Sequence, residues 1–213
     1  MFALFTVDNT RVKIDRKDVN YINANYVRAP SAGRTYILTQ GPLKHTAGHF
    51  WSMIWEQNTK GILMLNKVIE GGSLRCHQYW PDGSENGHDD EIIFDDVDLK
   101  VSLISSQKQN SYIFRKLQIT DLNTNEKRTV YHFHYVLWPD FDSPESYDSF
   151  LEYWEAVKMS ECLDNSKYGP AVVHCSAGIG RSGTFVLVDS CLLMVNFHLF
   201  NRLSLIIFIQ YFN

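Results

Sequence analysis

A cysteine and an arginine stand near the two ends of one short loop, and both residue types are well suited to handling phosphate. The loop reads His174-Cys175-Ser176-Ala177-Gly178-Ile179-Gly180-Arg181-Ser182-Gly183. Glycine permits the positive φ values that turn successive backbone N–H groups inward, and we expect this of Gly178 and Gly180. The loop is therefore predicted to be a cradle for an oxyanion such as phosphate.

The same loop would activate its cysteine. Inward-pointing N–H groups and the guanidinium of Arg181 favour the thiolate of Cys175 over the thiol, which makes the sulfur a nucleophile near neutral pH. Arg181 presents a planar fork that can hold two phosphoryl oxygens at once, a geometry that lysine cannot supply. The pattern predicts in-line attack of Cys175 on phosphorus. The residues predicted to bind the phosphate are Ser176, Ala177, Gly178, Ile179, Gly180 and Arg181.

A less specific interpretation of these residues also exists. A single cysteine after apolar residues is usually a buried core thiol, and Gly-x-Gly alone is a common turn. However, this loop combines a cysteine, two glycines and an arginine within seven positions. That combination favours the phosphate cradle.

A strand and a helix must position the loop. Ala171-Val172-Val173 before it predict a short buried strand, and the apolar segment 184–193 after it predicts a helix. The cradle would then join a strand to a helix N-terminus, whose positive end also favours an anion.

The rest of the chain predicts an α/β fold, a highly twisted mixed β-sheet flanked by helices. Strand-like segments lie at Arg11–Ile14, Tyr21–Val27, Thr35–Thr39, Gly61–Leu65, Leu74–Tyr79, Glu91–Phe94, Val97–Ile104, Tyr112–Ile119, Thr129–Leu137 and Ala171–His174. Helical segments fit Thr46–Gln57, Tyr147–Met159 and Ser182 to about Phe197. Within the second helix, the predicted core-facing stripe is Phe150, Leu151, Trp154 and Val157.

Length and composition predict one globular enzyme domain. The 213 residues are 45% hydrophobic, enough to bury a core without disulfides. The four cysteines show neither metal-ligand spacing nor a paired framework, so we expect a reducing, cytoplasmic setting, with the nucleus or a membrane surface reached through other regions. The net charge of −4 argues against nucleic acid as a partner. The apolar run at 203–212 is far shorter than the ~20 residues of a membrane span, and we expect no metal or cofactor.

The loop has the Cys-x5-Arg-Ser pattern of cysteine-based phosphatases, and the sequence resembles the classical protein tyrosine phosphatases from about Arg11 to about Met194. The segments that carry the resemblance are Asn20-Tyr21-Ile22-Asn23-Ala24, Tyr36-Ile37-Leu38-Thr39-Gln40-Gly41-Pro42, His49-Phe50-Trp51, Trp55-Glu56-Gln57, His132-Phe133-His134-Tyr135 and Trp138-Pro139-Asp140. The run from Gly72 to Trp80 resembles the non-receptor subfamily of the 1B and T-cell enzymes. The resemblance implies hydrolysis of protein phosphotyrosine.

This chemistry requires a second catalytic group, because a departing phenolate needs a proton that the thiolate cannot give. The resemblance implies that Asp140 is this general acid, on a mobile loop, and later the base for the hydrolytic water. Asp142 and Ser143 replace a glycine and an apolar residue usual in the family, so loop closure is expected to differ. Asp82 lies in a second Trp-Pro-Asp, which is predicted to be a solvated turn.

The resemblance implies supporting roles for five further residues. Glu70 would orient Arg181, and Arg75 stands where a lysine normally contacts the closed acid loop. Tyr79 and His174 would form a hydrogen-bonded pair beside the nucleophile. Ser182 would assist departure of the thiolate, although serine at a helix start is otherwise an ordinary cap.

We expect residues 1–194 to be a catalytic domain truncated at both ends, and residues 195–213 to be a divergent apolar tail. The predicted function is hydrolysis of phosphotyrosine in proteins through a cysteinyl-phosphate. Two alternatives remain open: a catalytically impaired phosphotyrosine-binding module and a dual-specificity phosphatase. His132 and His134 share one face of a strand, but they lack the acidic or cysteine partners of a metal site.

Overall fold

The computed structural model describes residues 7–17, 19–87, 89–139, 144 and 146–195. These residues form an eight-stranded sheet with the order β1-β2-β10-β3-β9-β8-β7-β6. Its strands are β1 (Ala24–Ala29), β2 (Arg34–Thr39), β3 (Gly61–Met64), β6 (Glu91–Phe94), β7 (Leu99–Lys108), β8 (Tyr112–Asp121), β9 (Lys127–Tyr135) and β10 (Ala171–His174). Strands β2, β10, β3 and β9 run parallel, and the outer strands pair antiparallel. The predicted mixed α/β sheet is confirmed.

Side chains of the central strands alternate between two apolar cores. In β3, Ile62 belongs to one core and Leu63 to the other, and Val172 and Val173 of β10 divide in the same way. Successive side chains of a strand point to opposite faces, so a strand covered on both faces must be apolar throughout. The continuous apolar runs of β3 and β10 have this cause.

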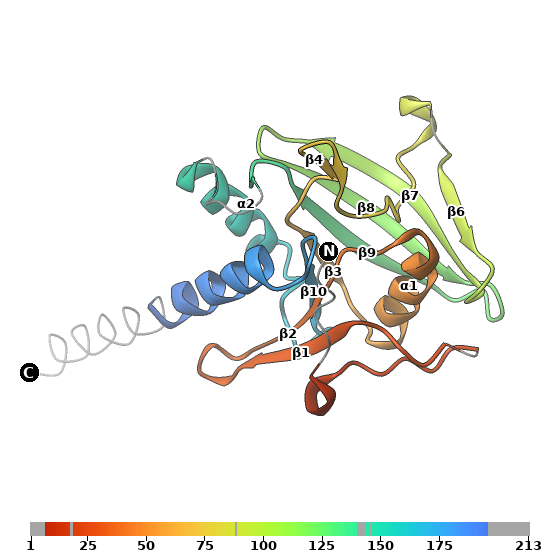
Figure 1. The fold of residues 1–213 in the computed structure, drawn as a ribbon, viewed down its shortest axis with the longest axis horizontal. Helices are drawn as coiled ribbons and strands as arrows, with labels where there is room; N and C mark the ends of the chain where they lie inside the picture. Colours follow the sequence, from red (N-terminus) through yellow and green to blue (C-terminus); the bar gives the residue numbers. More distant parts are fainter. Residues whose placement is uncertain (1–6, 18, 88, 140–143, 145, 196–213) are drawn as a thin grey trace, which may run out of the picture.

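Helices cover both faces of the sheet (Figure 1). Helix α1 (Ala47–Glu56) packs on one face through Phe50, Trp51 and Ile54. Helix α2 (Tyr147–Met159) and a helix at residues 180–195 pack on the other face. Ser146 caps α2, because its hydroxyl accepts the Ser149 N–H at 3.3 Å.

The predicted core stripe of α2 is wrong at one position. Leu151 is 41% exposed, whereas Tyr153 is fully buried. The buried residues Phe150, Tyr153, Trp154 and Val157 follow the i, i+3, i+4, i+7 pattern of one helix face. Leu151 lies about 100° away from Phe150 around the helix axis and so points toward water.

A buried carboxylate ties the 180–195 helix to the sheet. Asp189 is fully buried and accepts hydrogen bonds from Tyr36 of β2 and, at 2.7 Å, from the indole N–H of Trp154 of α2. Arg34 adds an ion pair at 3.4 Å. Since three elements meet at this carboxylate, the helix is fixed relative to the loop that precedes it.

Two predicted strands do not form as predicted. Arg11–Ile14 makes only an isolated bridge, from Arg11 to Asn25. Of Leu74–Tyr79, only Leu74 is in a strand, because the later backbone groups bond to loops: His77 N–H donates to the Pro42 carbonyl at 2.7 Å.

The segment before it contains a hairpin that the sequence analysis did not predict. Strands β4 (Ile69–Glu70) and β5 (Ser73–Leu74) pair around Gly71 and Gly72, which have φ values of 55° and 73°. Two residues of positive φ are what a tight hairpin turn of this kind requires, and Gly-Gly is a known signal for it.

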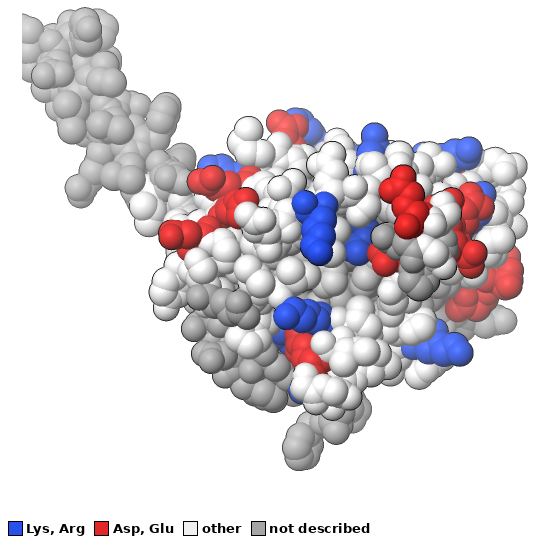
Figure 2. All heavy atoms as spheres, turned by 90° about the horizontal axis from the view of Figure 1, so that it is seen from above, with Lys and Arg blue, Asp and Glu red and all other residues white. Residues whose placement is uncertain are grey.

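Acidic side chains gather at the β6 side of the molecule, as Figure 2 shows. The exposed residues there are Asp89, Asp90, Glu91, Asp95 and Asp96. Charges of one sign at an edge strand disfavour pairing with a further strand.

Candidate active site

The loops of the site follow parallel strands that lie side by side in the sheet. Strand β10 ends at His174, directly before Cys175, and β3 ends before the hairpin that carries Glu70. Strand β9 ends before Trp138. Because β10, β3 and β9 are parallel neighbours, the loops at their carboxyl ends converge at one edge. Topology therefore brings together residues that are far apart in the sequence.

The loop after β10 curls around the sulfur of Cys175, which is 4% exposed. The Gly178 N–H points at the Cys175 Sγ, with 3.3 Å between nitrogen and sulfur. The backbone N–H groups of Ser176, Ala177 and Ile179 have no acceptor among the described residues. Unpaired N–H groups around a sulfur are the geometry that an anion-binding concavity requires, and phosphate binding by this loop stays a prediction.

Contacts on the outside of the loop hold this shape. The Gly41 N–H donates to the Ser176 carbonyl at 3.0 Å, and the Ser176 hydroxyl donates to the Arg75 carbonyl at 3.2 Å. These contacts leave the inner side of the loop to a ligand.

Only one of the two loop glycines has the predicted positive φ. Gly178 has a φ of 84°, and a Cβ there would overlap the Thr39 carbonyl of β2. Gly180 is the first residue of the 180–195 helix and is not among the glycines of positive φ, so the prediction for it is wrong.

We expect Gly178→Ala to distort the cradle. Overpacking costs about 1–3 kcal/mol and a positive φ at alanine about 1–2 kcal/mol, so the free energy of unfolding should fall and phosphate binding should weaken. Urea unfolding and phosphate titration would measure both. The control is Gly183→Ala, in the helix with open space around its Cα, which should preserve or raise stability. Equal behaviour of the two variants would contradict this account of Gly178.

The helix that begins at Gly180 directs its N-terminus at the loop, and this end favours anions. Ser182, in its first turn, is fully buried, and its hydroxyl has no partner in the described ranges. Its role toward the thiolate stays a prediction.

A bidentate carboxylate holds the arginine of the loop. The two terminal nitrogens of Arg181 lie 2.7 and 3.0 Å from the two oxygens of Glu70, and Arg181 is 7% exposed. Burial alone would raise the pKa of Glu70, but the hydrogen bonds from Arg181 and the Lys67 N–H outweigh it, and the pKa is lowered. The contact expected between Glu70 and Arg181 is present.

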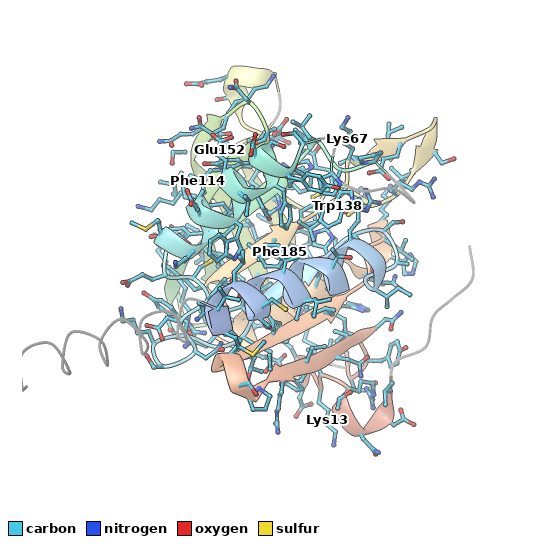
Figure 3. All side chains as sticks on the ribbon, turned by 90° about the vertical axis from the view of Figure 1, so that its left-hand side faces the viewer. Lys13, Lys67, Phe114, Trp138, Glu152 and Phe185 are labelled. Carbon is cyan, nitrogen blue, oxygen red and sulfur yellow. The ribbon has the colours of Figure 1, made fainter. Side chains whose placement is uncertain are left out.

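Arg181 also reaches the segment that leads to the predicted acid. It donates to the Trp138 carbonyl at 2.9 Å, a contact that the sequence analysis did not predict. The Trp138 ring packs edge-on against Phe150 of α2, with 5.4 Å between ring centroids. Trp138 and Phe185, both labelled in Figure 3, belong to the same apolar core as α2 and the 180–195 helix. The arginine therefore links the predicted phosphate cradle to the segment that precedes the predicted acid loop.

Three positions of the predicted acid loop, Asp140, Asp142 and Ser143, lie outside the described residues. The contact predicted between Arg75 and this loop stays a prediction. Arg75 itself lies beside Glu70, with 3.9 Å between its Nε and a carboxylate oxygen.

The second Trp-Pro-Asp leads into the turn that was predicted, at Ser84–Asn86, but Asp82 itself is only partly exposed. Asp82 pairs with Arg115 at 3.0 Å, and the Arg115 side chain is almost completely buried. The guanidinium also lies over the Trp80 ring, 5.0 Å from its centroid. Asp82 is therefore the counterion of a buried arginine.

Three buried histidines lie behind the cradle. Tyr79 contacts His174, as expected, with 2.7 Å between its hydroxyl oxygen and Nε2. The same hydroxyl lies 3.1 Å from the Nε2 of His132, and His134 bonds to the Asn66 carbonyl at 2.9 Å. Burial lowers the pKa of His174 to about 4 and of His134 to about 3, and that of His132 well below its ordinary value. All three are therefore neutral near pH 7.

These neutral histidines should make the protein less stable in mild acid. The ordinary pKa of histidine is 6.5, so between pH 6.5 and 5 the unfolded chain binds protons that the folded chain does not. The free energy of unfolding should fall with pH by about 1.4 kcal/mol per unit for each such histidine. Urea unfolding at pH 7.5, 6.0 and 5.0 would measure the slope. His45→Gln, at an exposed position, should leave it unchanged, and a flat profile would contradict the buried neutral state.

Comparison with known proteins agrees with the geometry of the site. The sequence profile described as Protein-tyrosine phosphatase matches residues 3–205. Tyrosine-protein phosphatase non-receptor type 2 of Mus musculus is 48% identical over 188 residues, 88% of this chain and 45% of that protein. Non-receptor type 61F of Drosophila melanogaster is 48% identical over 189 residues, 89% of this chain and 34% of that protein.

A more distant relative, non-receptor type 13 of Mus musculus, is 35% identical over 196 residues, 89% of this chain and 7% of that protein. The chain spans less than half the length of these relatives. The matched profile covers most of the chain and includes the cradle, the Glu70 hairpin and the Trp138 segment. The chain belongs to the protein-tyrosine phosphatase family.

Proposed function

We propose that this chain hydrolyses phosphotyrosine in proteins through a cysteinyl-phosphate intermediate. The observation that carries the proposal is the cradle, in which the Gly178 N–H points at the Cys175 sulfur at 3.3 Å. Other N–H groups of the loop lack partners in the described part of the chain. This is a site for a dianionic phosphoryl group with a nucleophile at its base.

In the first step, the Cys175 thiolate forms a bond to phosphorus while the bond from phosphorus to the tyrosine oxygen breaks. The loop N–H groups and Arg181 stabilise the negative charge on the phosphoryl oxygens. The departing phenolate takes a proton from Asp140. No cofactor takes part in this scheme.

In the second step, water attacks the phosphorus and gives a proton to the Asp140 carboxylate. The sulfur–phosphorus bond breaks, and inorganic phosphate leaves. The Ser182 hydroxyl, which is buried and without a partner in the described ranges, would donate a hydrogen bond to the returning thiolate. The enzyme is then ready for another substrate.

Phosphotyrosine-containing proteins are the proposed partners, and the proposed compartment is the cytoplasm. The four cysteines are free thiols, which suits a reducing compartment. Within the ranges described, no helix has both the length and the hydropathy that crossing a bilayer requires.

Steady-state hydrolysis of a phosphotyrosine peptide and a matched phosphoserine peptide tests this function. We expect turnover of the first and little turnover of the second. Comparable rates would instead indicate a dual-specificity phosphatase. Tight binding of the phosphotyrosine peptide without turnover would indicate an impaired binding module.

Asp140→Asn should lower turnover of aryl phosphates with poor leaving groups by about 10²–10⁴-fold. Substrates with very good leaving groups need no proton, so their turnover should fall much less. Steady-state kinetics over a leaving-group series would measure the difference. Asp148→Asn, at an exposed position of α2, is the control and should leave both rates unchanged. An equal loss across the series would mean that Asp140 is not the proton donor.

A further inference from the structure

One tyrosine hydroxyl lies between two histidines behind the nucleophile. The oxygen of Tyr79 is 2.7 Å from the Nε2 of His174 and 3.1 Å from the Nε2 of His132. All three side chains are fully buried. The His174 partner follows from the family resemblance, whereas the His132 partner does not.

The position of each proton follows from what each partner can donate. The Nδ1 of His174 lies 3.2 Å from the Cys175 carbonyl, which can only accept, so Nδ1 carries the proton. The Nε2 of this neutral ring must then accept, and its partner is the single Tyr79 O–H proton. The Tyr79 oxygen is left to accept from its other neighbour, so the Nε2 of His132 carries a proton.

We propose that His132 is a positioning residue for the nucleophile loop. The His132 Nε2–H donates to the Tyr79 oxygen, so the Tyr79 hydroxyl can donate only to the Nε2 of His174. The proton of His174 then stays on Nδ1, which donates to the Cys175 carbonyl. The chain of hydrogen bonds runs in one direction, from β9 to the cradle. This proposal rests on the proposed function.

The hydrogen bond from His174 to the Cys175 carbonyl fixes the plane of the peptide between Cys175 and Ser176. In a trans peptide the C=O of Cys175 and the N–H of Ser176 point in opposite directions. Holding the carbonyl on the His174 side therefore directs the Ser176 N–H away from it. That N–H has no acceptor in the described part of the chain, as expected of a group that awaits a phosphoryl oxygen.

The surroundings of His132 allow one tautomer. Its Nδ1 has no partner among the described residues, so a proton there would be buried without an acceptor. The charged and titratable groups that face it are Tyr79, His174, His134 and Arg115. The positive charge of Arg115 opposes protonation of the ring, and Trp80 packs on it with 4.9 Å between centroids.

Amide substitutions separate this role from general packing. The amide nitrogen of glutamine can reach where Nε2 lies, whereas that of asparagine cannot. His132→Asn should slow alkylation of Cys175 by iodoacetate about tenfold, because the loss of one hydrogen bond frees the peptide. His132→Gln should stay within about threefold of the wild type. The control is His134→Asn, because His134 is also buried, lies on the same face of β9 and bonds to the Asn66 carbonyl instead.

Alkylation needs no phosphorylated substrate, so it tests this proposal even if phosphotyrosine hydrolysis fails. Equal slowing by His132→Asn and His134→Asn, or no slowing by His132→Asn, would overturn the proposal. Nitrogen NMR of the wild-type histidines gives a second test that no variant can confound. We expect a protonated Nε2 in His132 and a protonated Nδ1 in His174, and the reverse at either ring would overturn it.

Discussion

Replacing Cys175 with serine should lower phosphotyrosine hydrolysis by at least about 10⁴-fold, the scale on which loss of a nucleophile acts. A serine hydroxyl is not ionised near pH 7, and nothing in the loop offers a base to remove its proton. The cradle itself should persist, because its shape depends on Gly178, Gly41 and the helix N-terminus. A phosphotyrosine peptide should therefore still bind, with an affinity within about tenfold of the wild type.

The control for this variant is Cys191→Ser. Cys191 is exposed on the 180–195 helix and belongs to no part of the site, so its loss should leave turnover unchanged. Phosphate release at fixed time points would measure turnover, and isothermal titration calorimetry would measure binding of the phosphotyrosine peptide. Hydrolysis that persists in Cys175→Ser would contradict the assignment of the nucleophile.

Arg181→Lys should lower kcat/KM by about 10³-fold. Lysine offers a point charge in place of a fork, so it cannot hold two phosphoryl oxygens while also bonding to Glu70 and the Trp138 carbonyl. The half-buried carboxylate of Glu70 would also lose its bidentate partner. Both effects should lower kcat/KM.

Arg128→Lys is the control for this substitution. Arg128 lies over the Trp55 ring, 3.8 Å from its centroid, and takes no part in the site. Its substitution should leave kcat/KM unchanged. If the two lysine variants have similar activity, Arg181 does not bind the transferred phosphoryl group.

The local pattern of apolar and polar residues was enough to predict several strands and helices. The strands Glu91–Phe94 and Ala171–His174 and the helix Tyr147–Met159 have the bounds that the sequence predicts. The two strands are short, largely apolar runs, whereas the helix has a clear 3.6-residue period and a cap at Ser146. The other three parallel central strands, β2, β3 and β9, were also predicted, within two residues at each end.

Long-range contacts explain where the pattern failed. The segment after Leu74 alternates polar and apolar residues like a strand, but its backbone bonds to loops: the Arg75 N–H donates to the Val68 carbonyl and the His77 N–H to the Pro42 carbonyl. The segment around Asp82 has the composition of a solvated turn, yet Asp82 pairs with Arg115, which is distant in the sequence. Local sequence patterns cannot predict a partner so far along the chain.

For the site, the sequence predicted residues but few of the contacts between them. Sequence motifs predicted Cys175, Arg181 and Glu70 as site residues, and the order of the parallel strands brings them to one edge of the sheet. The bonds from Arg181 to Trp138 and from His132 to Tyr79 join segments that are far apart in the sequence, so they could be found only in the folded chain. The roles of Asp140, Ser182 and Arg75 stay predictions.

Direct detection of the covalent intermediate tests the central claim. The protein would be mixed rapidly with a phosphotyrosine peptide, denatured within milliseconds, digested and analysed by mass spectrometry. We predict one phosphoryl group on the peptide that contains Cys175, formed before free phosphate accumulates and absent in Cys175→Ser. Release of phosphate with no phosphorylated Cys175 at any time would contradict the account, because water would then attack the substrate directly.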